Sequence, residues 1–316
     1  MRSLILNRLA SVIPVLFIVS LVAFLLTFLV PGDPAVALSG ENATDAMIER
    51  TRERLGLDQP PLVQYWQWLS GILLHFDFGE SLFSGGQVTD AILRRLPATL
   101  SLTVGAMIMG VAIGIPAGII CAVNQGKPID RLLTLGTSLG ISTPNYVLGL
   151  LLVGTLALRF QLFPATGYKS IAEAGVGGWL SHLVLPCITL GLLVAAVVAR
   201  MLRSSLIGVL EQDYIRMAKS KGMRWNVIIG KHALKNAMVP VVTVIGTQVA
   251  FLLGGAVIVE QIFGIQGVGT FAIIAVSSRD IPAVQAVVVF AAVAVLLVNL
   301  LVDISYAWFN PRVRSS

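Results

Sequence analysis

Six long segments of this chain contain no charged residue. Each has about 20 or more mostly apolar residues, the length that an α-helix needs to cross the hydrocarbon core of a bilayer. A backbone in hydrocarbon must satisfy its own hydrogen bonds, so segments of this kind fold as helices. The sequence therefore predicts an all-α polytopic membrane protein with six transmembrane helices, at Leu9–Val30, Ala98–Val123, Leu132–Leu158, Leu180–Ala199, Ala237–Val259 and Ile281–Val302.

The composition agrees with a membrane protein and excludes an ordinary soluble domain. Of the 316 residues, 56% are hydrophobic and 12% are charged, and the mean hydropathy is +0.87, whereas soluble domains carry about 25% charged residues. The first apolar segment is about twice as long as the apolar region of a signal peptide and lacks a cleavage site, so we expect it to be retained. Cys121 and Cys187 lie in apolar segments, where packing is their expected role.

The basic residues are distributed unevenly over the loops between these segments. With the N-terminus inside, 14 of the 22 Lys and Arg residues lie inside and 8 lie outside. Because the inside loops of membrane proteins are enriched in Lys and Arg, both termini are predicted to be cytoplasmic. The inside set is Arg2, Arg8, Lys127, Arg131, Arg200, Arg203, Arg216, Lys219, Lys221, Arg224, Lys231, Lys235, Arg312 and Arg314.

The long loop 31–97 would then lie outside. It carries nine acids and five arginines. A solvated loop is one interpretation, but its length favours an ordered structure that faces a partner. Residues 46–55 are predicted to be helical. Tyr65, Trp66 and Trp68 are predicted to lie at the bilayer surface, where amphipathic rings are favoured.

Small and polar residues mark three of the apolar segments. A stripe of glycines spaced four apart, at Gly110, Gly114 and Gly118, predicts close helix packing. Asn145 follows a proline that predicts a kink, and it either lines a pore or belongs to an ordinary packed kink. Gln248, inside the fifth segment, is the second candidate for pore lining.

The segment Asp213–Pro240 is the long polar interruption in the second half of the chain. It holds six basic residues and one acid. On charge alone it is a topology signal, because cytoplasmic loops are basic whatever the protein does. The order of its residues also predicts two short helices. They meet at Gly222, which tolerates the left-handed conformation of a C-terminal cap, and the second helix starts near Trp225.

The first of these helices has a predicted start and a predicted face. Asp213 is expected to be its N-cap, because a carboxylate can accept the first amide hydrogens of a helix. Tyr214, Met217 and Ala218 follow at spacings of three and four, so they are predicted to share one face.

The order of residues here also resembles a known family. Asp-Tyr-Ile-x-x-Ala-x-x-x-Gly, followed after nine residues by His-Ala-Leu-x-Asn-Ala-x-x-Pro, resembles the EAA loop of ABC-importer permeases. The resemblance is closest to the version in dipeptide, oligopeptide and nickel permeases. Ala218 and Gly222 match the second Ala and the Gly of the general pattern.

The resemblance assigns a role to this loop, which in the family forms coupling helices that dock into a groove on the ATPase subunit. Arg216 and Met217 replace the Glu and first Ala of the general pattern, and His232 and Lys235 replace its later Ile and Pro, as is common in the peptide branch. The residues that the resemblance places in ATPase docking and coupling are Asp213, Tyr214, Arg216, Ala218, Gly222, His232, Leu234 and Asn236.

Further motifs of the family occur in the expected order, at Pro31–Pro34, Leu55–Asp58, Phe78–Ser81 and Glu260–Gly269. The resemblance therefore covers nearly the whole chain. It implies the type I ABC importer transmembrane fold. Residues 1–95 would hold the first transmembrane helix and the long periplasmic or extracellular loop. Residues 96–307 would form the transport core, with a coupling loop at 211–238, and residues 308–316 a cytoplasmic tail.

The resemblance also implies a function, a location and partners. The chain would be a permease subunit in the bacterial cytoplasmic (inner) membrane that moves di- or oligopeptides by alternating access. A nickel or sugar importer of the same family is the alternative. The implied partners are a second, homologous permease, two ATP-binding subunits, an extracytoplasmic solute-binding protein and the lipid bilayer. ATP and Mg²⁺ would bind the partner ATPase, so this chain is expected to be no enzyme and to bind no cofactor, metal or nucleic acid.

Two functions outside the family, an intramembrane serine protease and a secondary transporter, fit the sequence less well. Gly136-Thr-Ser138-Leu-Gly140 spells the hydrolase elbow, but that motif needs a strand–turn–helix context. An intramembrane serine protease would also need a histidine, and His182 is predicted to lie near the opposite face of the membrane from Ser138. A secondary transporter would favour acids within the spans, and the six segments have none. Since no Walker A pattern occurs, ATP hydrolysis must come from another subunit.

Overall fold

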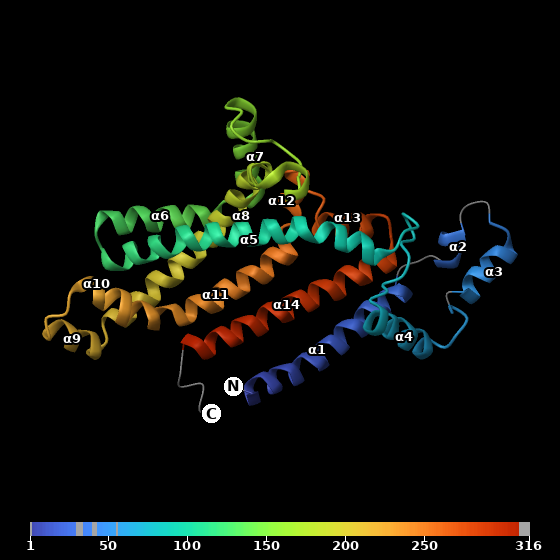
Figure 1. Ribbon diagram of the computed structural model, residues 1–316, viewed down its shortest axis with the longest axis horizontal. Helices are drawn as coiled ribbons and strands as arrows, with labels where there is room; N and C mark the ends of the chain where they lie inside the picture. The colour runs from blue at the N-terminus through green and yellow to red at the C-terminus, as the bar shows by residue number, and fades with distance from the viewer. Residues whose placement is uncertain (1, 30–33, 40–42, 55, 310–316) are drawn as a thin grey trace. The chain divides into compact units, whose positions relative to one another are not determined.

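The computed structural model describes residues 2–29, 34–39, 43–54 and 56–309. Apart from an isolated antiparallel bridge between Glu80 and Gln87, the regular elements of this part are helices, which confirms the predicted all-α class. They are, in chain order (Figure 1), α1 (Arg2–Leu29), α2 (Pro34–Ser39), α3 (Asp45–Arg54), α4 (Pro61–Ser70), η1 (Gly71–His75), α5 (Val88–Val123), α6 (Pro128–Ser142), α7 (Asn145–Leu152), η2 (Val153–Arg159), α8 (Ile171–Leu210), α9 (Asp213–Ser220), α10 (Trp225–Val227), η3 (Ile228–Ala233), α11 (Leu234–Gly255), α12 (Val257–Ile262), α13 (Val268–Ser277) and α14 (Ile281–Phe309).

Within the described residues, five continuous helices are long and apolar enough to span a membrane, and a bent pair makes up to six. The bent pair corresponds to the predicted span Leu132–Leu158, which is broken into Pro128–Ser142 and Asn145–Arg159 at an angle of 100°. Pro144 causes the break, because the residue before a proline is forced out of the helical region. Thr143 accordingly has an extended backbone, with φ −84° and ψ 121°.

The chain forms two compact units, which are described separately. Unit 1 consists of Met1–Ile5, Ala98–Gln266 and Val295–Ser316. Its central element is α8, which packs against α6, α7, α11 and α12 (Figure 1). One stripe of α8 is buried from its middle to its end, through Leu183, Leu190, Val194, Val198, Leu202 and Leu206. Since α9 follows α8 after only two residues, this stripe anchors the helix that leads into the coupling loop.

The predicted glycine stripe brings α5 into close contact with α8. A Cβ atom at Gly110 would lie 2.5 Å from Cγ1 of Val194, and one at Gly114 would lie 2.8 Å from the carbonyl oxygen of Ala195. Only a residue without a Cβ lets two helix backbones approach so closely. The packing role predicted for these glycines is confirmed.

Unit 2 consists of Leu6–Pro97 and Gly267–Ala294. Here α4 packs against α1 through aromatic rings, with 5.4 Å between the ring centroids of Phe24 and Tyr65. The hydroxyl of Tyr65 hydrogen-bonds that of Ser20 at 2.8 Å. Tyr65 is therefore buried inside unit 2 rather than placed at the bilayer surface as predicted, whereas Trp66 is 60% exposed. The error arose because three neighbouring rings on a helix cannot all face the same way.

The prediction that the long loop 31–97 holds ordered structure is confirmed for its described residues, which form α2, α3, α4, η1 and the start of α5. The segment between η1 and α5 is fixed by Asp280, the residue before α14. The Asp280 carboxylate accepts a hydrogen bond from Ser81 Oγ at 2.5 Å and one from the Leu82 amide at 3.1 Å. Two segments nearly 200 positions apart in the sequence thus meet in unit 2. Of the family motifs named above, residues 31–33 and Leu55 lie outside the described residues, as do tail residues 310–316.

Candidate functional site

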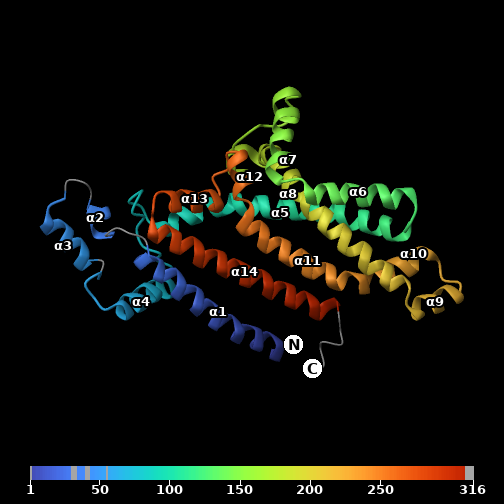
Figure 2. The same ribbon diagram turned by 180° about the vertical axis from the view of Figure 1, so that it is seen from behind.

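The candidate site is the predicted coupling loop, residues 211–238, which contains α9, α10, η3 and the start of α11. The α5–α6 turn lies at the same end of unit 1 as α9 and α10 (Figures 1 and 2). α9 begins at Asp213, and its N-cap is Gln212. The prediction that Asp213 is the cap is wrong by one residue. Its carboxylate instead approaches Arg216, at 3.5 Å from Nη1, in an exposed pair.

The buried face of α9 also differs from the prediction. Ile215 is fully buried and Ala218 is 9% exposed, while Tyr214 and Met217 are 41% and 59% exposed. The prediction placed the outward residues Tyr214 and Met217 on one face with the inward residue Ala218. In so short a helix, spacings of three and four do not distinguish the buried face from the exposed one. α9 is therefore anchored by Ile215 and Ala218 and presents Tyr214 and Met217 outward.

The turn after α9 has the conformation predicted at Gly222. Its φ is +73°, in the left-handed region that favours glycine. The Gly222 amide donates to the carbonyl of Lys219 at 2.9 Å, and the Met223 amide donates to that of Ala218 at 3.3 Å. These two bonds form a Schellman cap, which satisfies the last carbonyls of the helix. The cap fixes the direction in which the chain leaves α9.

The second half of the loop returns to the core of unit 1. The predicted second helix starts at Trp225 and passes through the π-helical η3 into α11. Ile228 and Ala233 are buried there, at 1% and 0% exposure. The two halves of the loop meet where the Asn236 side-chain amide donates to the Tyr214 hydroxyl at 2.8 Å. Two of the predicted site residues are thus in direct contact.

The remaining predicted site residues occupy distinct positions. Leu234 packs against the core of unit 1. His232 accepts a bond from Asn236 at its backbone oxygen, and its Nε2 is buried with no partner among the described residues. On the exposed side, Nζ of Lys219 lies 4.6 Å above the Trp225 ring. The outer surface therefore combines apolar side chains with positive charge.

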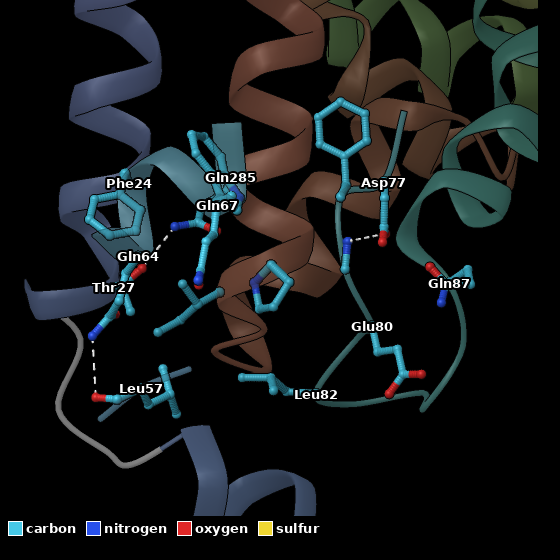
Figure 3. A pocket seen from close by; sticks show the side chains of 15 residues that line it. Phe24, Thr27, Leu57, Gln64, Gln67, Asp77, Glu80, Leu82, Gln87 and Gln285 are labelled. Carbon is cyan, nitrogen blue, oxygen red and sulfur yellow. Dashed lines mark hydrogen bonds between the residues drawn. The ribbon is translucent and has the colours of Figure 1, made fainter. Parts of the chain in front are cut away.

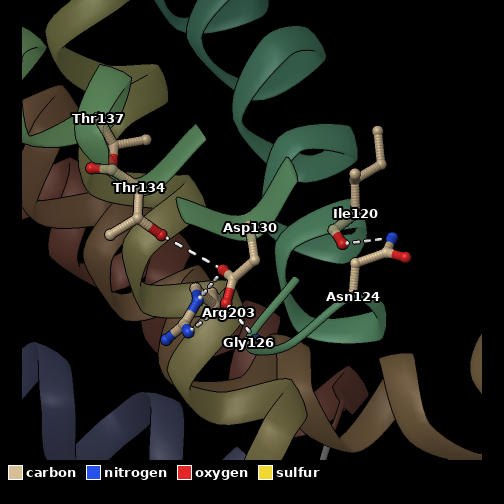
Figure 4. Close-up of polar contacts among 7 residues, drawn as sticks. All are labelled: Ile120, Asn124, Gly126, Asp130, Thr134, Thr137 and Arg203. Carbon is tan, nitrogen blue, oxygen red and sulfur yellow. Dashed lines mark hydrogen bonds and ion pairs between the residues drawn. The ribbon is translucent and has the colours of Figure 1, made fainter. Parts of the chain in front are cut away.

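An ion pair that the sequence did not predict holds the neighbouring α5–α6 turn to α8 (Figure 4). The carboxylate of Asp130, in the first turn of α6, accepts bonds from Arg203 Nε at 2.7 Å and Nη2 at 2.8 Å. It also accepts the Gly126 amide at 2.9 Å and the Thr134 hydroxyl at 3.3 Å. Asp130 is 3% exposed. The carboxylate thus joins the turn, α6 and α8 at one point.

The sequence contained some signal for the residues that the prediction missed, which are the pair Asp130 and Arg203 and the buried Ile215 and Ile228. Asp130 is the only acid between Asp90 and Glu173, and a lone acid in so apolar a stretch generally has a buried partner. Which residue it pairs with could not be predicted, because Arg203 lies 73 positions away. The apolar character of Ile215 and Ile228 was a weaker signal of burial in the protein, because an apolar residue near a membrane contacts either lipid or protein.

The candidate pore residues lie on different helices of unit 1. Asn145 begins α7 directly after the break at Pro144, and Gln248 lies within α11. Both are partly buried. Pore lining stays a prediction for both residues.

The elbow motif at Ser138 lies inside helix α6, which is not the strand–turn–helix that a hydrolase needs. Ser138 accepts a hydrogen bond from Arg200 Nη2 at 3.4 Å. His182 lies on the same helix as Arg200 but 18 positions earlier, which is about 27 Å along an α-helix. It bonds the Gly178 carbonyl instead. The geometry therefore gives no support to a serine protease.

Two family models match the chain. The model for the binding-protein-dependent transport system inner membrane component matches residues 114–315. The model for the N-terminal part of such membrane components matches residues 1–103. Together these matches cover both the coupling loop and the outer loop.

Curated relatives match over almost their entire length. A probable peptide ABC transporter permease protein, y4tP of Sinorhizobium fredii, is 40% identical over 310 residues, which is 98% of each chain. A putative peptide transport system permease of Brucella abortus is 40% identical over 99% of each chain. The glutathione transport system permease protein GsiC of Escherichia coli K12 is 41% identical over 315 residues, 99% of each chain.

Solved structures share the fold. The inward-facing MetNI methionine ABC transporter aligns with a TM-score of 0.56 at 18% identity, covering 69% of this chain and 96% of that one. An amino acid ABC transporter solved with histidines aligns with a TM-score of 0.52 at 20% identity, over 69% and 94%. At these identities the likeness concerns the fold alone.

Proposed function

The chain belongs to the family of binding-protein-dependent transport system inner membrane components, and from this membership we propose that it imports short peptides in a complex energised by a separate ATPase. It is the non-catalytic permease component of an ABC importer. As such it works with an ATPase and with a binding protein. Relatives named for peptide and glutathione transport, 40–41% identical over 98–99% of the chain, support a peptide cargo over nickel or sugar.

The full complex in this proposal contains a second, homologous permease and two ATP-binding subunits. Both termini face the cytoplasm, so the coupling loop faces the ATPase and the outer loop faces the binding protein. The transport core is taken as residues 96–307, a boundary that stays a prediction. ATP binding by the partners would supply the differential stabilisation of one state that alternating access requires.

The observation that carries the docking role is that α9 has one face buried against the core and another face exposed. Ile215 and Ala218 fix the helix to the core, the Gly222 cap fixes its end, and Met217 is left 59% exposed beside Tyr214. Exposed apolar side chains on a rigidly held element are typical of a docking surface. A loop that served only as a topology signal would need charge but no such anchorage.

The experiment that tests this role introduces a charge into the exposed apolar surface. In the assembled importer, Met217→Glu should leave thermal stability near normal and reduce ATPase co-purification by about tenfold, as for a residue central to an interface. Met47→Glu is the matched control, because Met47 is 53% exposed on α3. Normal co-purification and peptide uptake with Met217→Glu would contradict the docking role.

A further inference from the structure

Helix α4 and the π-helical turn η1 that continues it carry a row of exposed apolar side chains in unit 2. Leu62, Trp66 and Leu73 are between 60% and 75% exposed. Their spacings of four and seven residues place them on one stripe of the helix. Val63 and Leu74, beside this row, are exposed as well. These five side chains are called the α4 stripe below.

Another side of the same helix is buried against α1, which belongs to the same unit (Figure 1). The buried Tyr65 ring contacts the rings of Phe17 and Phe24, with 6.2 Å and 5.4 Å between the centroids. Its hydroxyl hydrogen-bonds that of Ser20 at 2.8 Å. α1 therefore holds α4 through this side, while the α4 stripe stays exposed.

The place of this contact along α1 sets the depth of α4 in the membrane. The apolar part of α1, Ser11–Leu29, has 19 residues, which corresponds to about 28 Å of helix. The hydrocarbon core of a bilayer is about 30 Å thick, so a helix that crosses it with this segment keeps the whole segment in hydrocarbon. Ser20 lies in the middle of the segment, and Phe24 lies between the middle and the end. α4 therefore meets α1 below the membrane surface, in the leaflet that adjoins the outer loop.

The charge pattern of the outer loop agrees with this depth. Between Asp58 and Asp77 the sequence has no Asp, Glu, Lys or Arg. α4 and η1, with 10 and 5 residues, are too short to cross a bilayer, and apolar helices of this length occur in membrane proteins as interfacial segments. By contrast, α3 in the same loop carries six charged residues among its ten. Charge is thus absent from the part of the loop that packs against the middle of α1.

Polar side chains beside this contact are bonded within unit 2. Gln285 on α14 donates to the Ala23 carbonyl at 3.1 Å and to the Thr27 hydroxyl at 2.8 Å (Figure 3). The side-chain amide of Gln64 donates to the Leu57 carbonyl at 3.2 Å. Hydrocarbon offers no hydrogen bonds, so polar groups at membrane depth need partners of this kind inside the protein. These amides are satisfied internally, whereas the α4 stripe presents apolar atoms outward.

We propose that the α4 stripe is a membrane-binding surface, embedded among the lipid acyl chains of the leaflet that adjoins the outer loop. Lipid is the occupant because the stripe lies at the depth of α1, whose apolar side chains Leu25 and Phe28 are also exposed in this unit. A helix that lies in the plane of the bilayer in this way anchors the outer loop to the membrane. The inference goes beyond peptide import, since it needs only that α1 crosses the membrane.

The test places a nitroxide spin label on the stripe in the assembled importer, without its binding protein, in nanodiscs of phosphatidylcholine and phosphatidylglycerol. Leu62→Cys and Leu73→Cys carry the label, and the cysteines of the partner subunits are replaced by serine. Met47→Cys is the matched control, because Met47 is 53% exposed on the charged helix α3. The frequency of collisions with oxygen is compared with that of collisions with a polar nickel chelate. The oxygen-to-nickel ratio should be at least about tenfold higher at positions 62 and 73 than at 47, because hydrocarbon excludes polar solutes.

The same experiment distinguishes lipid from the other possible surroundings of the stripe. Nickel collisions as frequent at positions 62 and 73 as at 47 would place the stripe in water and overturn the proposal. Rare collisions with both reagents would show that another subunit covers the stripe, which would also overturn it. Labels that the nickel chelate reaches until the binding protein is added would identify a protein docking surface in place of a lipid one.

Tryptophan fluorescence gives a second measurement that needs no label. Phosphatidylcholine brominated on its acyl chains quenches tryptophans that contact those chains. Brominated lipid should quench the wild-type importer more strongly than Trp66→Phe, which keeps an apolar ring at an exposed position. Trp225→Phe, in the predicted coupling loop, is the matched control and should be quenched like the wild type. Equal quenching of the wild type and Trp66→Phe, with thermal unfolding of the variant near normal, would contradict the proposal.

Discussion

Arg203 on α8 donates two hydrogen bonds to the buried carboxylate of Asp130 on α6, at 2.7 Å from Nε and 2.8 Å from Nη2. Two parallel bonds between planar groups fix orientation as well as distance. The Gly126 amide on the same carboxylate extends this constraint to the α5–α6 turn. The pair therefore locks the end of unit 1 at which the coupling loop lies.

Removing one partner should destabilise this end, because the other would be left buried and uncompensated. We expect Arg203→Met to cost roughly 2 kcal/mol or more, below the 3–5 kcal/mol of a fully buried pair, because the Arg203 side chain is 31% exposed. Arg203→Lys should cost less but should not restore the wild type, since Lys cannot make the paired contact. Thermal unfolding of the purified importer measures the effect. Arg94→Met, in an exposed pair at 3.9 Å, is the control and should change little.

The contact between Gly110 and Val194 predicts a compensated pair of substitutions. Gly110→Ala places a Cβ 2.5 Å from Cγ1 of Val194, and such overpacking typically costs about 1–3 kcal/mol. Val194→Gly removes both the methyl groups and the Cβ of Val194, which would otherwise lie 2.6 Å from the new atom, so the double variant should lose less thermal stability than the sum of the two single variants. Gly136→Ala is the control, because a Cβ there meets nothing within 4 Å. Losses that simply add would show that the clash is not the cause.

Ser138 is predicted to be dispensable. It lies inside α6 and its hydroxyl accepts one bond from Arg200 at 3.4 Å, so Ser138→Ala should change stability by less than about 1 kcal/mol. Uptake by the reconstituted importer should stay near normal. If the wild type cleaved peptides and the variant did not, the transporter assignment would have to be revised.

The membrane spans were predictable because each depends on the hydrophobicity and length of one continuous segment of the sequence. Each predicted span has a helical counterpart in the described chain, and the proline that breaks the third was visible in the sequence. The size of the break was not, because a proline predicts a kink, whereas the 100° between α6 and α7 depends on what each half packs against. Helices α5 and α8 also run past the predicted ends, because charged residues outside the bilayer are compatible with a helix.

The candidate site was predictable only where the backbone conformation determines which residue type can occupy a position. Gly222 was identified correctly because few other residues adopt a φ of +73°. The inward face of α9 was assigned wrongly, because Ile215 and Met217 are equally apolar and only the neighbouring core distinguishes them. The bonds of Asp130 with Arg203 and of Tyr214 with Asn236 join positions remote in sequence. Spacing along the chain carries no information on such pairs.

Topology is tested by labelling single cysteines from outside intact cells. Glu49→Cys lies on an exposed side of α3, and Lys221→Cys lies in the exposed part of the coupling loop. With both termini cytoplasmic, a membrane-impermeant maleimide should label position 49 and leave position 221 unlabelled until the membrane is permeabilised. Cys121 and Cys187 are buried, so the unmodified chain should give little background. The opposite labelling pattern would invert the orientation.

The last prediction concerns Gly222, where φ is +73° and a Cβ would meet nothing within 4 Å. The cost of a side chain is therefore conformational, about 1–2 kcal/mol for a residue with a Cβ in the left-handed region. Gly222→Val should loosen the cap that orients α9 while leaving the spans inserted. In the reconstituted importer, ATP hydrolysis should respond less to loaded binding protein, and uptake should fall with it.

Two controls separate conformation from bulk in the Gly222 experiment. Gly222→Asn should lose less than Gly222→Val, because asparagine tolerates the left-handed region better than a branched residue. Gly230→Ala adds a Cβ in the same loop, at a glycine where nothing lies within 4 Å and φ is not left-handed, and it should behave like the wild type. If Gly222→Val kept full stimulation and uptake, the orientation of α9 would not be needed for coupling, and the basic charge of the loop would remain only a topology signal.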